Sequence, residues 1–172
     1  MRIRGVDHEP EEDFAEFYRR CADACLRAVY ASVGDKSLAE DLTAEAFARA
    51  YASWRKVSQH PAPKAWVMRT ALNTHVSWWR RRRREVAWDA GLDRADGAEP
   101  ALALDPAIRT ALRALPTRQR QVLALRIFLD LDTATTAEVL GIAPGTVTTH
   151  LSRATAALRD ALAPAREQEP IR

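Results

Sequence analysis

The segment from Thr133 to Leu162 constrains the fold most, because its pattern specifies two helices joined by one tight turn. Apolar residues recur at helical spacing on both sides of Gly141 and Pro144. Glycine suits the left-handed conformation that ends a helix, and proline suits the first turn of the next one. A short helix, a tight turn and a longer helix form the pattern of a helix-turn-helix unit. The alternative is a plain helical hairpin with a solvated polar face.

The second helix of this unit carries the residues expected to meet DNA. When such a helix enters a major groove, its N-terminal polar positions reach base edges and phosphates. Val147 and Leu151 face inward at this spacing, so they cannot read a sequence. The turn residues, the helical spacing of the apolar residues and the polar composition of the second helix all fit a helix-turn-helix unit. This agreement favours DNA binding over a solvated hairpin. The predicted recognition positions are Gly145, Thr146, Thr148, Thr149, His150, Ser152 and Arg153.

The length of 172 residues suits one domain or two small ones, and the net charge is +3. No stretch approaches the length of apolar sequence that spans a membrane, and the N-terminus lacks the apolar core of a signal peptide. We therefore expect a cytoplasmic protein. Cys21 and Cys25 share one helical face, which favours two reduced core cysteines over a metal site or a disulfide. The sequence predicts no metal and no cofactor.

The N-terminal half begins with a helical stripe of apolar residues that starts near Asp13 and ends at Gly34. Ser37 and Glu40 have the spacing of a capping box and predict the start of the next helix. That helix is expected to run to about Trp54, with an acidic outer face. Such a face is usually only solvated, although it also suits a basic docking partner.

A further helix is expected from Lys64, and it ends in a run of five arginines preceded by Trp78 and Trp79. A helix dipole favours one or two cations at this end, but five repel one another unless a polyanion neutralises them. Aromatic rings that stack on bases, next to arginines that hold phosphates, are typical of single-strand binding. The run therefore favours nucleic acid over a merely basic helix end.

The chain divides at an acidic segment punctuated by glycine and proline, which we interpret as a flexible linker. Helical pattern resumes at Ile108, is broken at Pro116 and continues through the helix-turn-helix unit. The predicted fold is all-α, with two small helical domains. The expected boundaries are an N-terminal domain (1–86), the linker (87–106), a C-terminal domain (107–164) and a disordered tail (165–172).

The order of these parts resembles a known family. The stretch from Leu115 to Arg159 is similar to the C-terminal promoter-binding domain of bacterial RNA polymerase sigma factors, and more narrowly to their extracytoplasmic-function (ECF) group. In this half the resemblance rests on Leu115-Pro116, Gln119-Arg120, Val122-Leu123, Leu125-Arg126, Leu140-Gly141, Gly145-Thr146-Val147 and Arg153-Ala154. In the N-terminal half it rests on Ala39-Glu40-Asp41-Leu42, Glu45-Ala46-Phe47, Ala65-Trp66-Val67, Asn73 and the arginine run.

The resemblance implies a sigma factor, which is not an enzyme, that binds core RNA polymerase and directs it to particular promoters. It also implies an anti-sigma factor as a regulator. The polymerase-binding residues would be Glu40, Asp41, Glu45 and Arg49. The residues that hold single-strand promoter DNA would be Trp66, Arg69, Asn73, Trp78, Trp79, Arg80, Arg81, Arg82, Arg83 and Arg84.

Four positions depart from the family pattern. Ala44 replaces a common Gln, Leu72 replaces an Arg that often precedes Asn73, and Thr148 and His150 replace basic residues. These departures bear on the strength of polymerase and phosphate contacts and on promoter choice. Three alternatives stay open: a helix-turn-helix regulator that does not dock on polymerase, an enzyme acting on nucleic acid, and a diverged sigma-like adaptor that does not melt promoters.

Overall fold

The computed structural model describes the backbone of residues 10–85 and 105–166 and the side chains of residues 14–78 and 105–163. Within these ranges every regular element is an α-helix, as the sequence predicted. The N-terminal half contains α1 (Pro10–Val33), α2 (Lys36–Ala52), α3 (Trp54–Val57) and α4 (Pro63–Glu85). The C-terminal half contains α5 (Pro106–Ala114), α6 (Thr117–Phe128), α7 (Thr133–Leu140) and α8 (Pro144–Arg166). Most of the predicted linker and all of the tail beyond residue 166 lie outside the described residues.

The start of α2 corrects one prediction from the sequence. The residue that caps this helix is Asp35, whose carboxylate accepts a 2.8 Å hydrogen bond from the backbone N–H of Leu38. The predicted cap, Ser37, already lies inside the helix. Both side chains suit an N-cap, and Gly34 decides between them because its φ of +81° ends α1 just before Asp35.

The helix-turn-helix unit forms as predicted, and local chemistry explains both of its ends. The carboxylate of Asp132 caps α7 by accepting a 2.7 Å hydrogen bond from the backbone N–H of Thr135. Gly141 closes α7 in the left-handed conformation, with a φ of +64°. Pro144 then opens α8, where its missing N–H needs no partner.

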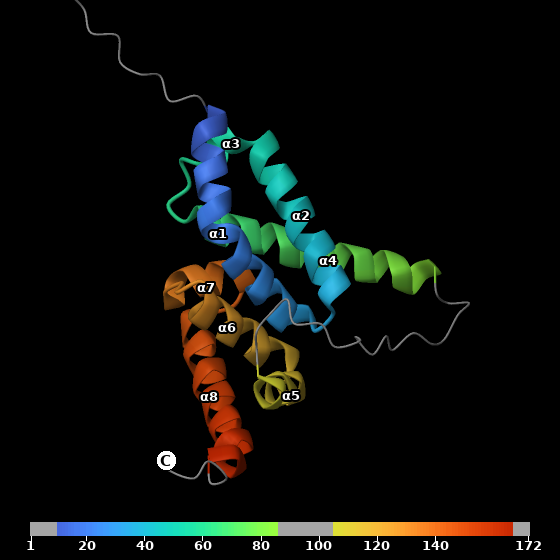
Figure 1. Ribbon diagram of the computed structural model, residues 1–172, viewed down its shortest axis with the longest axis vertical. Helices are drawn as coiled ribbons and strands as arrows, with labels where there is room; N and C mark the ends of the chain where they lie inside the picture. The colour runs from blue at the N-terminus through green and yellow to red at the C-terminus, as the bar shows by residue number, and fades with distance from the viewer. Residues whose placement is uncertain (1–9, 86–104, 167–172) are drawn as a thin grey trace, which may run out of the picture.

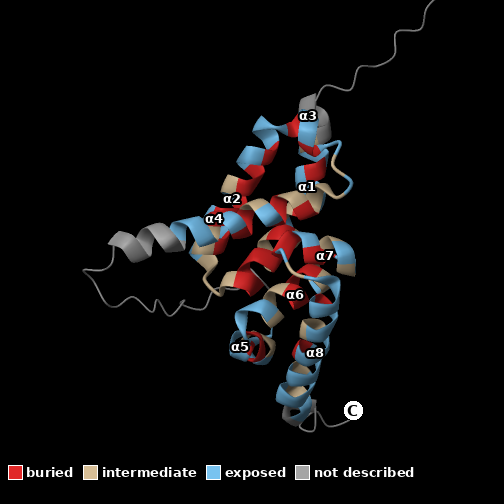
Figure 2. Ribbon diagram, turned by 180° about the vertical axis from the view of Figure 1, so that it is seen from behind, coloured by how far each residue is buried: buried red, intermediate tan, exposed pale blue. Residues whose placement is uncertain are grey.

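One hydrophobic core extends through both halves of the molecule. Helix α6 packs along α1, and α7 packs against α4, so that side chains from the two halves are buried together. Figures 1 and 2 show α6 and α7 beside these N-terminal helices, and Figure 2 shows buried segments where the two halves meet. The largest completely buried side chains in this core include Val29, Leu42, Met68, Val122, Leu125 and Leu129. Cys21 and Cys25 are free and buried in the same core, as the sequence predicted.

A smaller core holds the C-terminal half together on its other side. Leu112 of α5, Leu123 of α6 and Ala154 of α8 are buried against one another. Val147, also in α8, instead joins the large core and has no exposed surface. Helix α8 is thus fixed along one side by two cores, which leaves the opposite side of its first turns exposed.

Three basic side chains cross between the halves, and each donates to a carbonyl near the end of a helix. Lys64 at the start of α4 donates a 3.1 Å hydrogen bond from Nζ to the carbonyl oxygen of Leu129, which ends α6. Arg120 of α6 donates to the carbonyl of Ser32, and Arg113 of α5 donates to that of Gly34, each at 3.4 Å. The last carbonyls of a helix lack partners within it and carry partial negative charge, which favours cations there.

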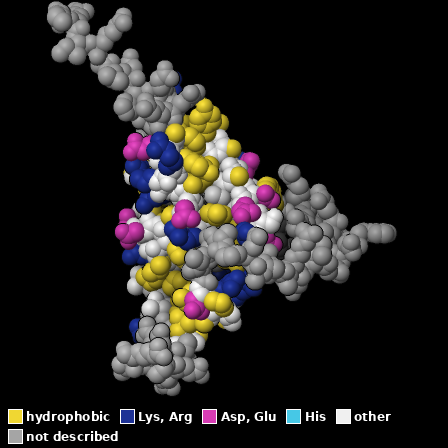
Figure 3. All heavy atoms as spheres, in the orientation of Figure 1, with side chains coloured by type: hydrophobic (Ala, Val, Ile, Leu, Met, Phe, Trp, Pro, Cys, Tyr) yellow, Lys and Arg dark blue, Asp and Glu magenta, His cyan; other side chains and the backbone are white. Residues whose placement is uncertain are grey.

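Helix α4 extends away from the body of the molecule, and α8 extends in a different direction (Figure 1). Acidic and basic side chains are interspersed over the described surface in the view of Figure 3. Neither sign of charge therefore dominates the described part of this face.

Candidate nucleic-acid and polymerase interfaces

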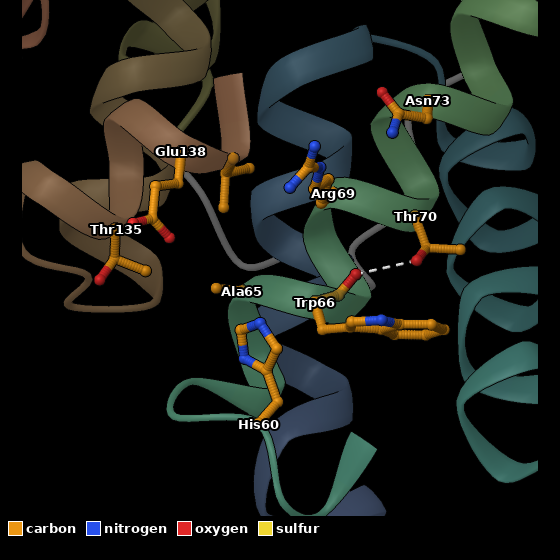
Figure 4. A pocket seen from close by; sticks show the side chains of 9 residues that line it. His60, Ala65, Trp66, Arg69, Thr70, Asn73, Thr135 and Glu138 are labelled. Atoms are coloured by element: carbon orange, nitrogen blue, oxygen red, sulfur yellow. Dashed lines mark hydrogen bonds between the residues drawn. The ribbon is translucent and has the colours of Figure 1, made fainter. Parts of the chain in front are cut away.

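The first half of α4 presents three of the predicted single-strand residues along one side of the helix. Trp66 is half-buried, whereas Arg69 and Asn73 are exposed. These positions are three and four residues apart, so their side chains follow one another along the helix. The hydroxyl of Thr70 donates a 2.9 Å hydrogen bond to the carbonyl of Trp66 within the same turns (Figure 4).

The same three side chains line a cavity of about 260 Å³. Ring, guanidinium and amide groups around one cavity provide an apolar surface together with hydrogen-bond donors and an acceptor. On the α4 side of the cavity, this combination suits a nucleotide base with its phosphate, since bases stack on rings and phosphates pair with guanidinium groups. The lining residues are His60, Ala65, Trp66, Arg69, Thr70, Asn73, Thr135, Glu138 and Val139.

Part of this cavity comes from residues that the sequence did not single out. His60 lies in the loop before α4, and its Nδ1 accepts a 3.0 Å hydrogen bond from the backbone N–H of Ala62. Thr135, Glu138 and Val139 belong to α7 in the other half of the chain and form a wall of the cavity (Figure 4). No local sequence signal could reveal this wall, because only the packing of the two halves creates it.

The second half of α4 continues the helix through the arginine run to Glu85. Trp78 is 37% exposed, which leaves its indole available to a partner. The side chains of Trp79 and of the five arginines, Arg80 to Arg84, lie outside the described residues. Leu72 is buried in the large core, so the position where the family often has arginine serves packing in this chain.

The predicted recognition positions on α8 fall on its exposed side, with one exception. Gly145, Thr146, Thr148, Thr149, Ser152 and Arg153 are all exposed, and Val147 between them is completely buried. The Thr149 hydroxyl donates a 3.0 Å hydrogen bond to the carbonyl of Gly145. The Thr148 hydroxyl donates a 3.3 Å hydrogen bond to the carbonyl of Pro144. Each hydroxyl proton is thus used within the helix, which leaves an acceptor oxygen and a methyl group for a partner.

His150 differs from the other predicted recognition residues. Its ring is half-buried, and Nδ1 is inaccessible to solvent with no hydrogen-bond partner. A buried polar atom without a partner costs free energy, so this orientation holds only while packing of the ring compensates for it. Within this orientation Nε2 is the ring atom left to meet a base, which makes His150 a more restricted reader than its exposed neighbours.

The outer face of α2 is acidic, as predicted. Glu40 and Asp41 are exposed, and Glu45 forms a 2.7 Å salt bridge with Arg49. Ala44 lies between these charges and is exposed as well. The small side chain at this position leaves room for another helix to approach the backbone of α2 closely.

Two family models match the chain, each on one half of the structure. Sigma-70 region 2 matches residues 17–85, and sigma-70 region 4 matches residues 106–158. The RNA polymerase sigma-E factor of Streptomyces coelicolor is 34% identical over 152 residues, which cover 87% of this chain and 86% of that protein. The chain belongs to the ECF group of RNA polymerase sigma factors. As a sigma factor, it binds core RNA polymerase and directs promoter recognition and transcription initiation.

Other comparisons agree with this assignment. The ECF sigma factor SigW of Bacillus subtilis is 29% identical over 177 residues, which cover 94% of this chain and 95% of SigW. Among solved structures, sigma factor RpoE from Bartonella quintana, bound to the anti-sigma factor NepR, superposes with a TM-score of 0.78 at 26% identity. That superposition covers 88% of this chain and 97% of RpoE, so it includes both halves.

Family membership argues against two of the three alternatives left open by the sequence, the regulator that does not dock on polymerase and the enzyme. A helix-turn-helix regulator without a polymerase-binding half does not fit a chain that matches regions 2 and 4 in order. Sigma factors are non-enzymatic regulators, which is the class that the sequence predicted.

None of the described helices is long and apolar enough to cross a membrane. The described residues also contain no group of three metal-ligating side chains.

Proposed function

We propose that this sigma factor divides promoter recognition among three surfaces. The acidic face of α2 docks on core RNA polymerase, α4 holds the unwound non-template strand, and the first turns of α8 read the upstream promoter element in duplex DNA. The observation that carries the proposal is the cavity beside α4, which brings Trp66, Arg69 and Asn73 together on one side of the helix. Because polymerase acts in the bacterial cytoplasm, we place the protein there.

The α2 surface is tested by reversing its charge. Asp41→Arg combined with Glu45→Arg should weaken binding to core polymerase while the helical circular dichroism spectrum stays unchanged. A control with the same change in charge replaces the exposed Glu16 and Asp160, which lie on other helices. Unchanged core affinity of the α2 variant in a titration would remove this surface from the interface.

The α4 surface is tested in the holoenzyme, where strand opening is measured by permanganate reactivity of thymines. Replacing Trp66 by Ala should remove a stacking contact worth about 1–3 kcal/mol, and Arg69→Ala should act in the same direction. Arg55→Ala on α3 removes an arginine that is also exposed but lies outside the cavity, and it serves as the control. Open complexes that form at the wild-type level in both α4 variants would contradict the assignment.

The arginine run extends the same proposal to residues 80–84, which would neutralise phosphates of the unwound strand. Each lost contact should reduce the salt dependence of holoenzyme binding by about 0.7 in the log–log slope for single-stranded DNA. A variant with all five arginines replaced by alanine should therefore have a clearly shallower slope. A wild-type slope in that variant would show that the run makes no phosphate contacts.

We also propose an anti-sigma factor as a partner of this chain. The support is the likeness to RpoE of Bartonella quintana, whose solved structure contains the anti-sigma factor NepR. Co-purification of the chain at native expression levels, followed by a transcription assay with each bound protein, tests this proposal. A co-purifying protein that binds the chain and lowers transcription is the expected result.

A further inference from the structure

Three arginine side chains line a small hollow beside the end of α1. Arg109 and Arg113 belong to α5, and Arg120 belongs to α6. The other residues that line the hollow are Tyr30, Ala31, Gly34 and Leu112. None of the residues proposed for polymerase docking, strand binding or promoter reading lines this hollow, so it is a separate feature of the molecule.

The hollow concentrates positive charge. Arg109 and Arg113 lie four residues apart on α5, where like charges oppose helix formation. Burial, and then the charge of Arg113, lower the pKa of Arg120 below its usual value. Among the described residues no salt bridge pairs any of these three guanidinium groups with an Asp or a Glu. An anion bound at the hollow would therefore relieve repulsion that the described part of the chain does not balance.

Two carboxylates stand close to the hollow along the chain, and both already cap helices. Asp35 follows Gly34 and accepts a 2.8 Å hydrogen bond from the backbone N–H of Leu38. Asp105 precedes α5 and accepts a 2.7 Å hydrogen bond from the backbone N–H of Ala107. Neither carboxylate forms a salt bridge with the three arginines, so their charge is left for an external anion.

Much of the hydrogen-bonding capacity of the three guanidinium groups is unused. Each group carries five N–H donors in a fixed planar fork. Arg113 donates to the carbonyl of Gly34 at 3.4 Å, and Arg120 donates to three carbonyls at 3.3–3.4 Å. These distances exceed the usual range for N–H···O bonds, so the carbonyls hold the side chains weakly. The Arg109 side chain has no hydrogen-bond partner within the described ranges.

The size of the hollow restricts the kind of anion that fits. Its volume of about 10 Å³ is room for one oxygen-sized group. Arg113 is exposed, whereas Arg109 and Arg120 are half-buried, so cations line both the inside and the mouth. A phosphate group suits this arrangement, because one oxygen fills the hollow and the others pair with guanidinium forks outside it.

We propose that Arg109, Arg113 and Arg120 form a binding site for a phosphate group, and that the ligand is a small molecule with a di- or triphosphate. Three guanidinium groups balance more than one negative charge, which favours two linked phosphates over one. The ligand would hold α5 and α6 beside the end of α1 and thereby stabilise the fold. This site is independent of the surfaces proposed on α2, α4 and α8.

Binding is measured by isothermal titration calorimetry of the full chain with pyrophosphate, without divalent metal and at constant ionic strength. Residues 80–84 are replaced by alanine in every chain, because this arginine run is another dense cluster of cations. We expect one pyrophosphate per chain. Arg109→Gln with Arg113→Gln should weaken binding about tenfold or more, since each removes hydrogen bonds from a charged group.

The matched control is Arg19→Gln with Arg159→Gln, which makes the same change in charge at exposed positions on α1 and α8. This control should leave the affinity for pyrophosphate unchanged. Absence of binding to the chain with intact Arg109 and Arg113, or equal weakening by the two pairs of substitutions, would overturn the proposal.

Chemical modification locates the ligand without any substitution, so misfolding of a variant cannot affect the result. Phenylglyoxal reacts with accessible arginines, and peptide mass spectrometry gives the rate at each position. Pyrophosphate should slow the reaction at Arg109 and Arg113 and leave the rate at Arg19 unchanged. Equal rates at Arg109 and Arg113 with and without pyrophosphate would contradict a site at the hollow.

Two further titrations identify the source of the phosphate group, because duplex DNA offers the same chemistry along its backbone. ATP without divalent metal represents small phosphorylated molecules, and a duplex of random sequence represents nucleic acid. We expect Arg109→Gln with Arg113→Gln to weaken ATP binding about tenfold and to leave duplex binding unchanged. Weaker binding of the duplex alone would overturn the assignment to a small ligand and place the phosphate on the DNA backbone.

Discussion

Replacing Leu125 by alanine tests whether the two halves of the chain share one core. Leu125 is completely buried on α6 in the core that also contains side chains of α1 and α4. The substitution removes about three carbon groups at roughly 0.8 kcal/mol each, or about 2.4 kcal/mol in transfer free energy. The cavity left behind raises the cost to about 3–4 kcal/mol, within the range of measured Leu→Ala changes. For a chain of this size the midpoint of thermal unfolding should fall by roughly 6–16 °C.

The assay is urea and thermal unfolding followed by circular dichroism. Because the core is continuous, we expect one cooperative transition that moves as a whole to lower urea concentration in Leu125→Ala. The matched control is Ile127→Ala on the same helix, whose side chain is 65% exposed and whose loss should change stability by less than about 0.5 kcal/mol. Two separate transitions, of which Leu125→Ala moves only one, would refute a shared core. So would equal effects of the two substitutions.

Three further predictions concern local sites. Thr149→Ala on α8 should shift the preferred upstream element in a promoter-library selection, at about 1–3 kcal/mol for the affected base pair, with unchanged thermal stability. Hydrogen bonds from the backbone N–H and hydroxyl of Thr135 lower the pKa of Asp132, so this carboxylate stabilises the fold above its ordinary pKa and the contribution is lost as pH falls through the lowered value. Asp132→Asn should therefore make the unfolding midpoint less sensitive to acid. Burial, together with the neighbouring Cys21 thiol, raises the pKa of Cys25 to about 12, so at pH 8 a thiol reagent should react with the native chain far more slowly than with the urea-unfolded chain.

Local chemistry explains which parts of the fold the sequence could predict. Gly141 and Pro144 fix the turn of the helix-turn-helix unit through their own backbone preferences, without help from distant residues. The start of α2 was harder, because Asp35 and Ser37 are both good caps and only the end of the preceding helix decides between them. Boundaries of this kind depend on the neighbouring element as well as on the residues themselves.

The candidate sites show the same difference between local and distant effects. Spacing along α8 correctly predicted a buried Val147 among exposed polar neighbours. It placed His150 on the outer face, although packing partly buries the ring. The resemblance to the family predicted that Trp66 and Arg69 act at one site on α4. Nothing in the sequence predicted that Glu138 lines the same cavity. That contact joins segments on either side of the predicted linker, and it arises only from the way the two halves pack.

The central claim is that this chain directs core RNA polymerase to particular promoters, and transcription from a randomised promoter library tests it most directly. Core polymerase is incubated with the library in the presence and absence of the chain, and the transcripts are sequenced. We expect start sites that require the chain and share an upstream element and a second element close to the start. If the chain binds core polymerase but gives no transcripts beyond those of core alone, or gives start sites without any shared element, the claim is contradicted.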